Sequence, residues 1–261
     1  MILDFSQNGI NIQFEISEDK SVALKHFSNK AATETDKKVK WCPALELHIS
    51  GLNQNDHHGA KHTGTSGSIS LKYDCHKYYE NEKGNKLEIS LKDDNVCATV
   101  HYQFYSGISA VRSWTTVINI SNENVGLEYV SSFAYTGLSH NNPRVFIPHN
   151  SWLREANWKE YTLSELGFDR NSEFSTKRIS ISNTGTWSCK EYLPMAAYED
   201  NDEILMWQIE NNGSWQWEIS DISDMIYLKV SGPTEHENHW YKELAPNEEF
   251  ESVKACVVLG N

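Results

Sequence analysis

Residues 53–65, NQNDHHGAKHTGT, form the segment of this chain whose side chains are best suited to chemistry. It holds one carboxylate, one ammonium group and three imidazoles: Asp56, Lys61, His57, His58 and His62. Such a set could bind a metal, exchange protons, hold a polar ligand or form an exposed turn. Adjacent histidines on an extended chain point to opposite faces, and the segment has neither an H-E-x-x-H pattern nor a spaced cysteine. We therefore expect no metal and no cofactor.

Motifs for other chemistries are missing from the sequence. It contains no G-x-S-x-G elbow of a serine hydrolase and no glycine-rich phosphate loop of either common type. Carboxylates are abundant, but the sequence alone cannot place two of them across a sugar at the separation that glycosidases need. Most of them are expected on a solvated face, and no catalytic residue is assigned.

The overall charge and the cysteines restrict the partners and the compartment. The 261 residues carry a formal net charge of −13, which repels phosphate backbones and anionic lipid. The N-terminus lacks the features of a signal peptide, and no apolar run approaches transmembrane length. The five cysteines are scattered without a C-x-x-C pair, which favours reduced thiols. We expect a cytoplasmic protein that binds neither nucleic acid nor membranes.

The elements that must position residues 53–65 are β-strands, because apolar residues recur at every second position. In GINIQFEIS, Ile10, Ile12 and Phe14 share one face, and LELHI, SISLKY, KLEISLK, AVRSWTTVINI, EILMWQIE and MIYLKVSG alternate in the same way. Each run is short and bounded by turn residues, which is typical of antiparallel strands with one buried face. Only residues 154–168 suggest a short helix or two, ending near Gly167. The pattern predicts one large β-sandwich.

One candidate hairpin and the tryptophans around it stand out. Asn212-Gly213 is a dipeptide that favours the positive φ angles of a tight turn, and Trp215 and Trp217 alternate after it. The chain holds nine Trp and twelve Tyr. We expect Trp207, Trp215 and Trp217 to pack mainly in the core or between the sheets, with a sugar-facing role as the alternative.

Four segments in order resemble the N-terminal domain of bacterial α-galactosidases of glycoside hydrolase family 36. They are residues 41–65, 105–135, 179–219 and 230–252. The second segment carries Arg112 and Asn119 in an R-x-x-x-x-x-x-N pattern. The last resembles the family's closing strands, with Trp240, Pro246 and Phe250 in place. Together the segments cover nearly the whole chain.

The resemblance implies an all-β fold: a two-sheet antiparallel super-sandwich, galactose mutarotase-like, with a few short helices. Residues 1–261 would be a single sandwich domain, the N-terminal fragment of a longer enzyme. Family members are retaining, with an Asp nucleophile in a K-W-D motif of a (β/α)8 barrel. Here Lys40-Trp41 is followed by Cys42, and no second catalytic Asp segment is present. The chain would thus be the non-catalytic domain of an α-galactosidase.

The resemblance also gives the polar segment 53–65 an expected role. In oligomeric family members the sandwich lends a loop to a neighbouring subunit's active site. We therefore expect Asp56, His57, His58 and Lys61 to be substrate-binding residues that contact an α-galactoside oligosaccharide in a full-length homo-oligomer. Their side chains should be exposed when the domain is alone. The alternative is a long turn in which the histidines satisfy backbone groups.

Two other function classes remain open. One is a stand-alone carbohydrate-binding sandwich. The other is a sugar mutarotase-like enzyme, which shares the broad sheet architecture. A mutarotase needs a His acid and a Glu base facing each other on a concave sheet, and no N-H-x-Y-F-like segment is present.

Overall fold

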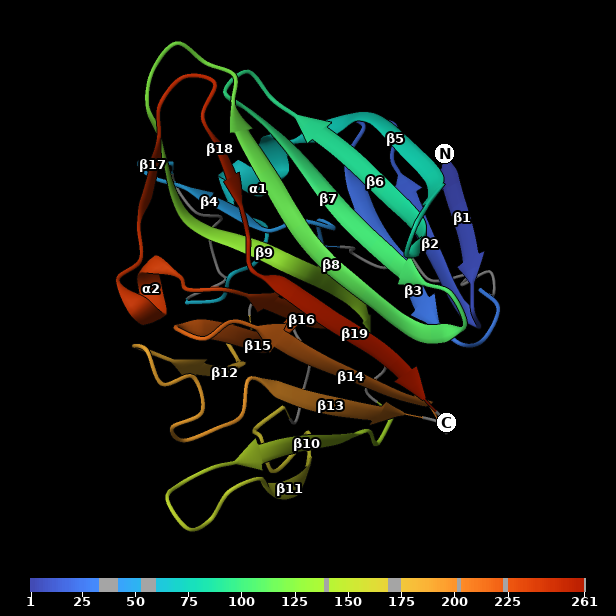
Figure 1. The fold of residues 1–261 in the computed structure, drawn as a ribbon, viewed down its shortest axis with the longest axis vertical. Coiled ribbons are helices and arrows are strands. Elements are labelled where there is room, and N and C mark those ends of the chain that lie inside the picture. Colours follow the sequence, from blue (N-terminus) through green and yellow to red (C-terminus); the bar gives the residue numbers. More distant parts are fainter. Residues whose placement is uncertain are drawn as a thin grey trace.

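Two layers of antiparallel sheet form the molecule, as the computed structural model shows (Figure 1). It describes residues 1–32, 42–52, 60–138, 141–168, 175–200, 203–222 and 225–260. One layer is a ten-stranded sheet, in the order β11-β10-β13-β14-β19-β8-β7-β6-β5 with β18 beside β8. Its strands are β5 (Lys72–Asn81), β6 (Gly84–Lys92), β7 (Val96–Tyr105), β8 (Ile108–Asn119), β10 (Arg144–His149), β11 (Asn157–Thr162), β13 (Met195–Asp200), β14 (Glu203–Glu210), β18 (Glu249–Glu251) and β19 (Lys254–Gly260).

The second layer contains a six-stranded and a three-stranded sheet. The six-stranded sheet has the order β12-β15-β16-β9-β17, with β4 beside β9. Its strands are β4 (Leu47–Ile49), β9 (Val125–Leu138), β12 (Arg178–Asn183), β15 (Trp215–Ile222), β16 (Met225–Ser231) and β17 (Lys242–Leu244). The three-stranded sheet consists of β1 (Ile2–Gln7), β2 (Ile10–Ile16) and β3 (Val22–Ser28). It joins the second layer through β3, where the ring centroids of Phe27 and Phe133 of β9 lie 5.3 Å apart.

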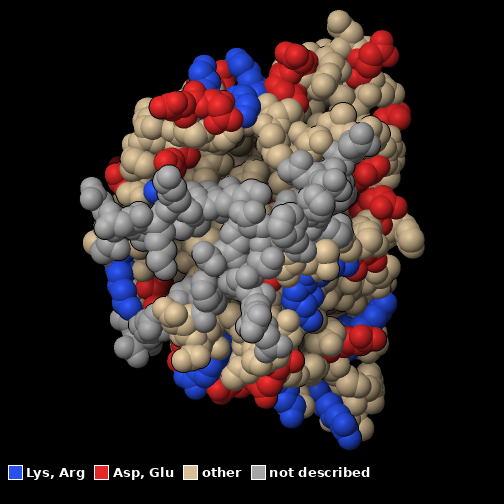
Figure 2. All heavy atoms as spheres, turned by 180° about the vertical axis from the view of Figure 1, so that it is seen from behind, with Lys and Arg blue, Asp and Glu red and all other residues tan. Residues whose placement is uncertain are grey.

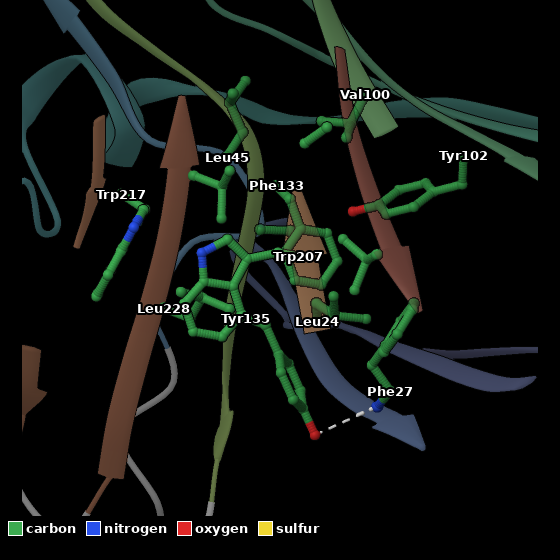
Figure 3. Packing of buried hydrophobic residues seen from close by; sticks show 14 of the residues in the cluster. Leu24, Phe27, Leu45, Val100, Tyr102, Phe133, Tyr135, Trp207, Trp217 and Leu228 are labelled. Carbon is green, nitrogen blue, oxygen red and sulfur yellow. Dashed lines mark hydrogen bonds between the residues drawn. The ribbon is translucent and has the colours of Figure 1, made fainter. Parts of the chain in front are cut away.

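The core lies between the layers, and the alternation in sequence explains it. In β2 the residues Ile10, Ile12 and Phe14 are at most 1% exposed, while those between them are partly exposed. Trp207 from β14 and Trp217 from β15 meet across the layers, with ring centroids 5.3 Å apart and an interplanar angle of 76° (Figure 3). Such an edge-to-face contact is a favoured geometry for aromatic pairs. The predicted all-β sandwich and the predicted burial of these tryptophans are confirmed.

The predicted hairpin at Asn212-Gly213 is wrong. Strands β14 and β15 on its two sides belong to different sheets, so this segment carries the chain from one layer to the other. Neither residue has a positive φ. A tight hairpin does occur at Asn8-Gly9, where φ is 53° and 80° and Gln7 pairs with Ile10. The same dipeptide therefore turns within a sheet at one site and crosses between sheets at the other.

The helices also differ from the prediction. Residues 157–162 of the expected helical segment form strand β11, which pairs along its whole length with β10, and turns follow up to Gly167. Tertiary pairing overrides the local helical pattern here. In the run expected as a strand from Ser68, residues Ser66–Ser70 form helix α1, and the strand begins only at Lys72. A second short helix, α2, spans Glu235–Asn238.

Candidate functional site

Lys61 is the one predicted site residue that the structure describes, and it is buried. Its side chain is 1% exposed, so the exposure expected for it is wrong. The ammonium group donates to the carbonyl of Ser175 at 2.6 Å, to Asp221 Oδ1 at 2.7 Å and to the Asp221 carbonyl. These three oxygens replace water around the charge, which is what burial of an ammonium group requires. Asp56, His57 and His58 lie outside the described residues, and their sugar contacts stay a prediction.

Lys61 belongs to a larger set of polar side chains on the outer face of the six-stranded sheet. Along β15 and β16, alternate residues point away from the core, yet they are as buried as the apolar ones. Segment 60–68 lies over this face. We call the following residues the buried polar cluster: Glu46, His48, Lys61, His62, Tyr129, Arg178, Glu218, Asp221, Tyr227 and Lys229. All of them are at most 6% exposed, except Arg178, whose side chain is 19% exposed.

Glu218 is the electrostatic centre of the cluster. Its Oε1 lies 2.6 Å from Lys229 Nζ on the neighbouring strand, and its Oε2 accepts from Arg178 Nη1 at 3.1 Å. Burial pushes the pKa of Glu218 up, but the charge and hydrogen bond of Lys229, with Arg178, outweigh it and lower that pKa to about 2. Glu218 is therefore an ionised, fixed partner in an ion-pair chain that continues to Glu237, 2.7 Å from Arg178 Nη1.

Hydrogen bonds from the sheet hold segment 60–68 in place. The backbone N–H of His62 donates to Glu218 Oε1 at 3.3 Å, and Lys229 Nζ donates to Thr63 Oγ1 at 2.9 Å. Glu46 accepts from the N–H of Gly64 and from the hydroxyl of Ser68, each at 2.7 Å. Burial raises the pKa of Glu46, and these two hydrogen bonds oppose the rise. The segment is thus attached to the sheet by side chains that lie far from it in sequence.

Helix α1 approaches the sheet closely at Gly67. A Cβ at this position would lie 2.6 Å from the carbonyl oxygen of Leu47 in β4. Thr65 caps the helix, since its hydroxyl accepts from the N–H of Ser68 and donates to the Leu47 carbonyl at 2.7 Å. A larger residue at Gly67 would force the helix away from β4.

Two buried histidines stack beside a tyrosine at the edge of the cluster. The rings of His62 and Tyr129 are nearly parallel, 4.2 Å apart at 5°, and His48 lies 4.8 Å from His62. Burial lowers the pKa of His48 to about 4 and that of His62 well below its ordinary value. Both imidazoles are therefore neutral at neutral pH. Within the described part of the chain, neither ring nitrogen of His62 has a hydrogen-bond partner.

Glu218 suits a structural role better than a catalytic one. Its carboxylate is ionised and held by two cations, so it is a weak base with no freedom to move toward a substrate. The described residues contain no group of three His, Cys, Asp or Glu placed to hold a metal. Neither described helix is long and apolar enough to cross a bilayer. On the side seen in Figure 2, Lys and Arg side chains lie next to Asp and Glu around the edge of the described surface.

Sequence reasoning missed the cluster because its residues alternate with apolar ones and so resemble a solvated face. The usable signal was the pairing of β15 with β16. These strands are joined by only residues 223–224, and their register places Glu218 directly opposite Lys229. Opposite charges at facing positions of a predicted hairpin would have suggested an ion pair. Nothing in the local sequence signals that segment 60–68 covers it.

Comparison with known proteins places the fold. No family model matches the sequence, and no curated protein matches it. Among solved structures, the GH36 α-galactosidase AgaA from Geobacillus stearothermophilus superposes with a TM-score of 0.77 at 12% identity, over 100% of this chain and 41% of that one. The α-galactosidase from Lactobacillus brevis gives 0.74 at 12% identity, over 100% and 39%. Variants of AgaA are known in complex with raffinose and with stachyose.

A shorter protein shares the architecture less closely. The putative aldose 1-epimerase from Escherichia coli K12 gives a TM-score of 0.56 at 12% identity, over 100% of this chain and 99% of that one. At such identities the likeness concerns the fold. The chain has the fold of the N-terminal domain of GH36 α-galactosidases and spans about 41% of the length of AgaA. The predicted super-sandwich is therefore confirmed.

Proposed function

We propose that this chain acts as the non-catalytic N-terminal domain of an α-galactosidase, an enzyme that hydrolyses terminal α-galactosides. The observation that carries the proposal is the superposition of this whole chain on about 41% of the GH36 α-galactosidase AgaA. The pairing of Glu218 with Lys229 and Arg178 in the buried polar cluster agrees with a structural role. A catalytic (β/α)8 barrel would belong to the rest of such an enzyme. A cytoplasmic location remains part of the same prediction.

Within this function, the buried polar cluster would hold the C-terminal end of the predicted substrate-binding segment 53–65. Segment 60–68 is attached to the sheet by Lys61, Glu46 and Glu218, so this part of the chain is held rigidly. Asp56, His57 and His58 would contact the α-galactoside, while Lys61 would anchor the loop. A rigid support of this kind reduces the cost of ordering a binding loop.

An exposed apolar surface supports the proposed oligomer. Trp152, Leu153 and Trp187 are 76%, 82% and 54% exposed, and the two tryptophans line a hollow of about 300 Å³ near β10 and β11. Leu153 has a φ of 63°, a left-handed conformation that is unfavourable for a leucine. Large exposed apolar groups held in this way are typical of surfaces that pack against a partner. We propose this surface as a contact with a second copy of the chain in the homo-oligomer.

The first test asks whether the chain alone hydrolyses the substrate. Residues 1–261 should release nothing above buffer from p-nitrophenyl α-galactoside, since the expected catalytic aspartates belong to the barrel. Clear turnover that disappears on mutation of one internal carboxylate would overturn the assignment. In a longer enzyme that contains these residues, the same assay should give full activity.

A pair of variants in that longer enzyme tests the two ends of the loop. Asp56→Ala should change the free energy of unfolding by no more than about 0.5 kcal/mol. It should lower kcat/KM by the equivalent of about 1.5 to 3 kcal/mol, the worth of a charged hydrogen bond. Lys61→Met, in contrast, should lower the free energy of unfolding and the melting temperature, because it leaves Asp221 buried without its cation. Unchanged kinetics in Asp56→Ala would make the loop a structural turn.

The fold of the putative aldose 1-epimerase keeps a second candidate function open, a sugar mutarotase. It is favoured by the coverage of nearly all of that protein and by the presence of His and Glu side chains on one sheet face. The fixed pairing of Glu218 disfavours it. Polarimetry of fresh α-D-galactose should show no acceleration by the chain. Acceleration lost in both His62→Asn and Glu218→Gln would favour the mutarotase.

A further inference from the structure

A second polar surface lies on the opposite side of the sandwich, on the outer face of the ten-stranded sheet. A hollow of about 490 Å³ opens there over β5–β8 and β19, on the side that faces the viewer in Figure 1. Its volume lies in the ordinary range of small-molecule sites. Its lining residues are Tyr79, Asn81, Glu82, Lys83, Lys86, Gln103, Tyr105, Arg112, Trp114 and Lys254. We call this the outer hollow.

Aromatic rings provide the apolar part of the outer hollow. Trp114 and Gln103 are 9% and 4% exposed and form its floor, while Tyr79 is 41% exposed and forms part of its rim. Trp114 stacks on His101 with centroids 4.8 Å apart. The ammonium groups of Lys86 and Lys254 lie 5.0 and 5.4 Å from the Trp114 ring centroid. Rings with a polar surround match the alternating C–H and O–H faces of a sugar.

The charged groups of the hollow are balanced. Arg112 forms a two-pronged contact with Glu210, and Lys254 lies 2.8 Å from Glu251. Lys86 lies 2.8 Å from Glu88, whose Oε1 also accepts from the hydroxyl of Tyr79 at 3.0 Å. Each of these three cations therefore has a carboxylate partner, and Lys83 and Glu82 add one lining charge of each sign. The wall offers donors and acceptors side by side but little net charge, which suits a neutral polyhydroxyl ligand better than an anion.

The amide groups at the floor are also held in place. Asn81 Nδ2 donates to Gln103 Oε1 at 2.7 Å, and Gln103 Nε2 donates to the carbonyl of Phe104 at 2.8 Å. Burial lowers the pKa of His101 to about 4, so the imidazole behind Trp114 carries no charge at neutral pH. Most of the lining is positioned before any ligand arrives, which lowers the cost of binding.

From this geometry we propose that the outer hollow is a binding site for a neutral sugar, separate from segment 60–68. The ligand would contact Tyr79 and the small exposed part of Trp114, and it would exchange hydrogen bonds with the Arg112–Glu210 and Lys86–Glu88 pairs. The site goes beyond the proposed function, since it requires neither the barrel nor a second subunit. It would hold an oligosaccharide on the face of the domain opposite the buried polar cluster.

Ligand-observed NMR titration of the 261-residue chain with raffinose tests the proposal. We expect saturable binding with a dissociation constant on the order of 1 mM. Tyr79→Ala and Trp114→Phe should each weaken binding roughly three- to tenfold, the worth of one aromatic contact. Trp187→Ala, which changes an exposed tryptophan elsewhere, is the matched control and should leave binding unchanged. Tyr79 is a rim residue, so its variant keeps the test valid if Trp114→Phe fails to fold.

Three results would overturn the proposal. The first is the absence of saturable raffinose binding up to roughly 50 mM, well above the expected constant. The second is a preference for the anionic sugar galacturonate that high salt removes, because it would make the hollow an anion site. The third is loss of binding in Trp187→Ala but not in Tyr79→Ala, since the sugar would then bind elsewhere.

Discussion

The two outer faces of this sandwich use the same side chains with different consequences. Each carries a lysine–glutamate pair and a histidine stacked on an aromatic ring: Glu218–Lys229 on neighbouring strands with His62 on one face, and Glu88–Lys86 within β6 with His101 on the other. The first pair is fully buried beneath segment 60–68, whereas the second stands beside an open hollow. Covering such a face turns it into structural support, and leaving it open keeps it available to a ligand.

Removing one cation from each face should give the largest contrast. Lys229→Met leaves Glu218 buried with only the partly exposed Arg178 beside it, and we expect a loss of about 3 to 5 kcal/mol in the free energy of unfolding. Lys86→Met on the open face should cost no more than about 1 kcal/mol, because water can solvate Glu88. Urea unfolding followed by circular dichroism measures both. Equal losses would show that burial does not separate the two faces.

Acid should reveal the same contrast through Glu218. Its folded-state pKa of about 2 lies below the ordinary value of 4.5, so its ionised form stabilises the fold above pH 4.5 and this contribution is lost as pH falls through about 2. The contribution is on the order of 3 kcal/mol. The difference in unfolding free energy between the wild type and Glu218→Gln should therefore shrink as pH falls from 4.5 toward 2.

The matched control for this acid titration is Glu88→Gln. Burial raises the pKa of Glu88, but the hydrogen bond and charge of Lys86 outweigh this effect. The net pKa of Glu88 is therefore lowered, as it is for Glu218. Solvent screening reduces its effect, and the corresponding difference should change less with pH. A pH-independent difference for Glu218→Gln would mean that this carboxylate is not ionised in the folded protein.

The fold could be predicted from sequence because it depends on local alternation. Ile10, Ile12 and Phe14 of β2 are buried as their spacing predicts, and the ordered segments resembling GH36 sandwiches indicated the architecture. The connection at Asn212-Gly213 could not be predicted, because a short polar turn has the same residues whether it returns to its own sheet or crosses to the other.

The candidate site was only partly predictable, since its contacts join distant parts of the chain. Segment 53–65 was singled out by composition, but the burial of Lys61 depends on Asp221, which lies 160 residues away. Glu218 and Lys229 have the pattern of a solvated face until a separate segment covers them. The outer hollow likewise needs Trp114 of β8 and Lys254 of β19 on adjacent strands. A single sequence indicates which residues share one face of a strand, but not which other segment covers that face.

The smallest expected effect concerns an ion pair of the open face and completes the contrast. Arg112 and Glu210 contact each other through two hydrogen bonds, with side chains 35% and 27% exposed. A double-mutant cycle with Arg112→Ala and Glu210→Ala should give a coupling energy of about 0.2 to 1 kcal/mol. Because water surrounds part of the pair, added salt should reduce this coupling further. The same cycle for Lys61→Met and Asp221→Asn should give a larger value that salt barely changes, since both side chains are at most 1% exposed. A salt-insensitive coupling of several kcal/mol between Arg112 and Glu210 would contradict this contrast and place the open pair in the same class as the buried ones.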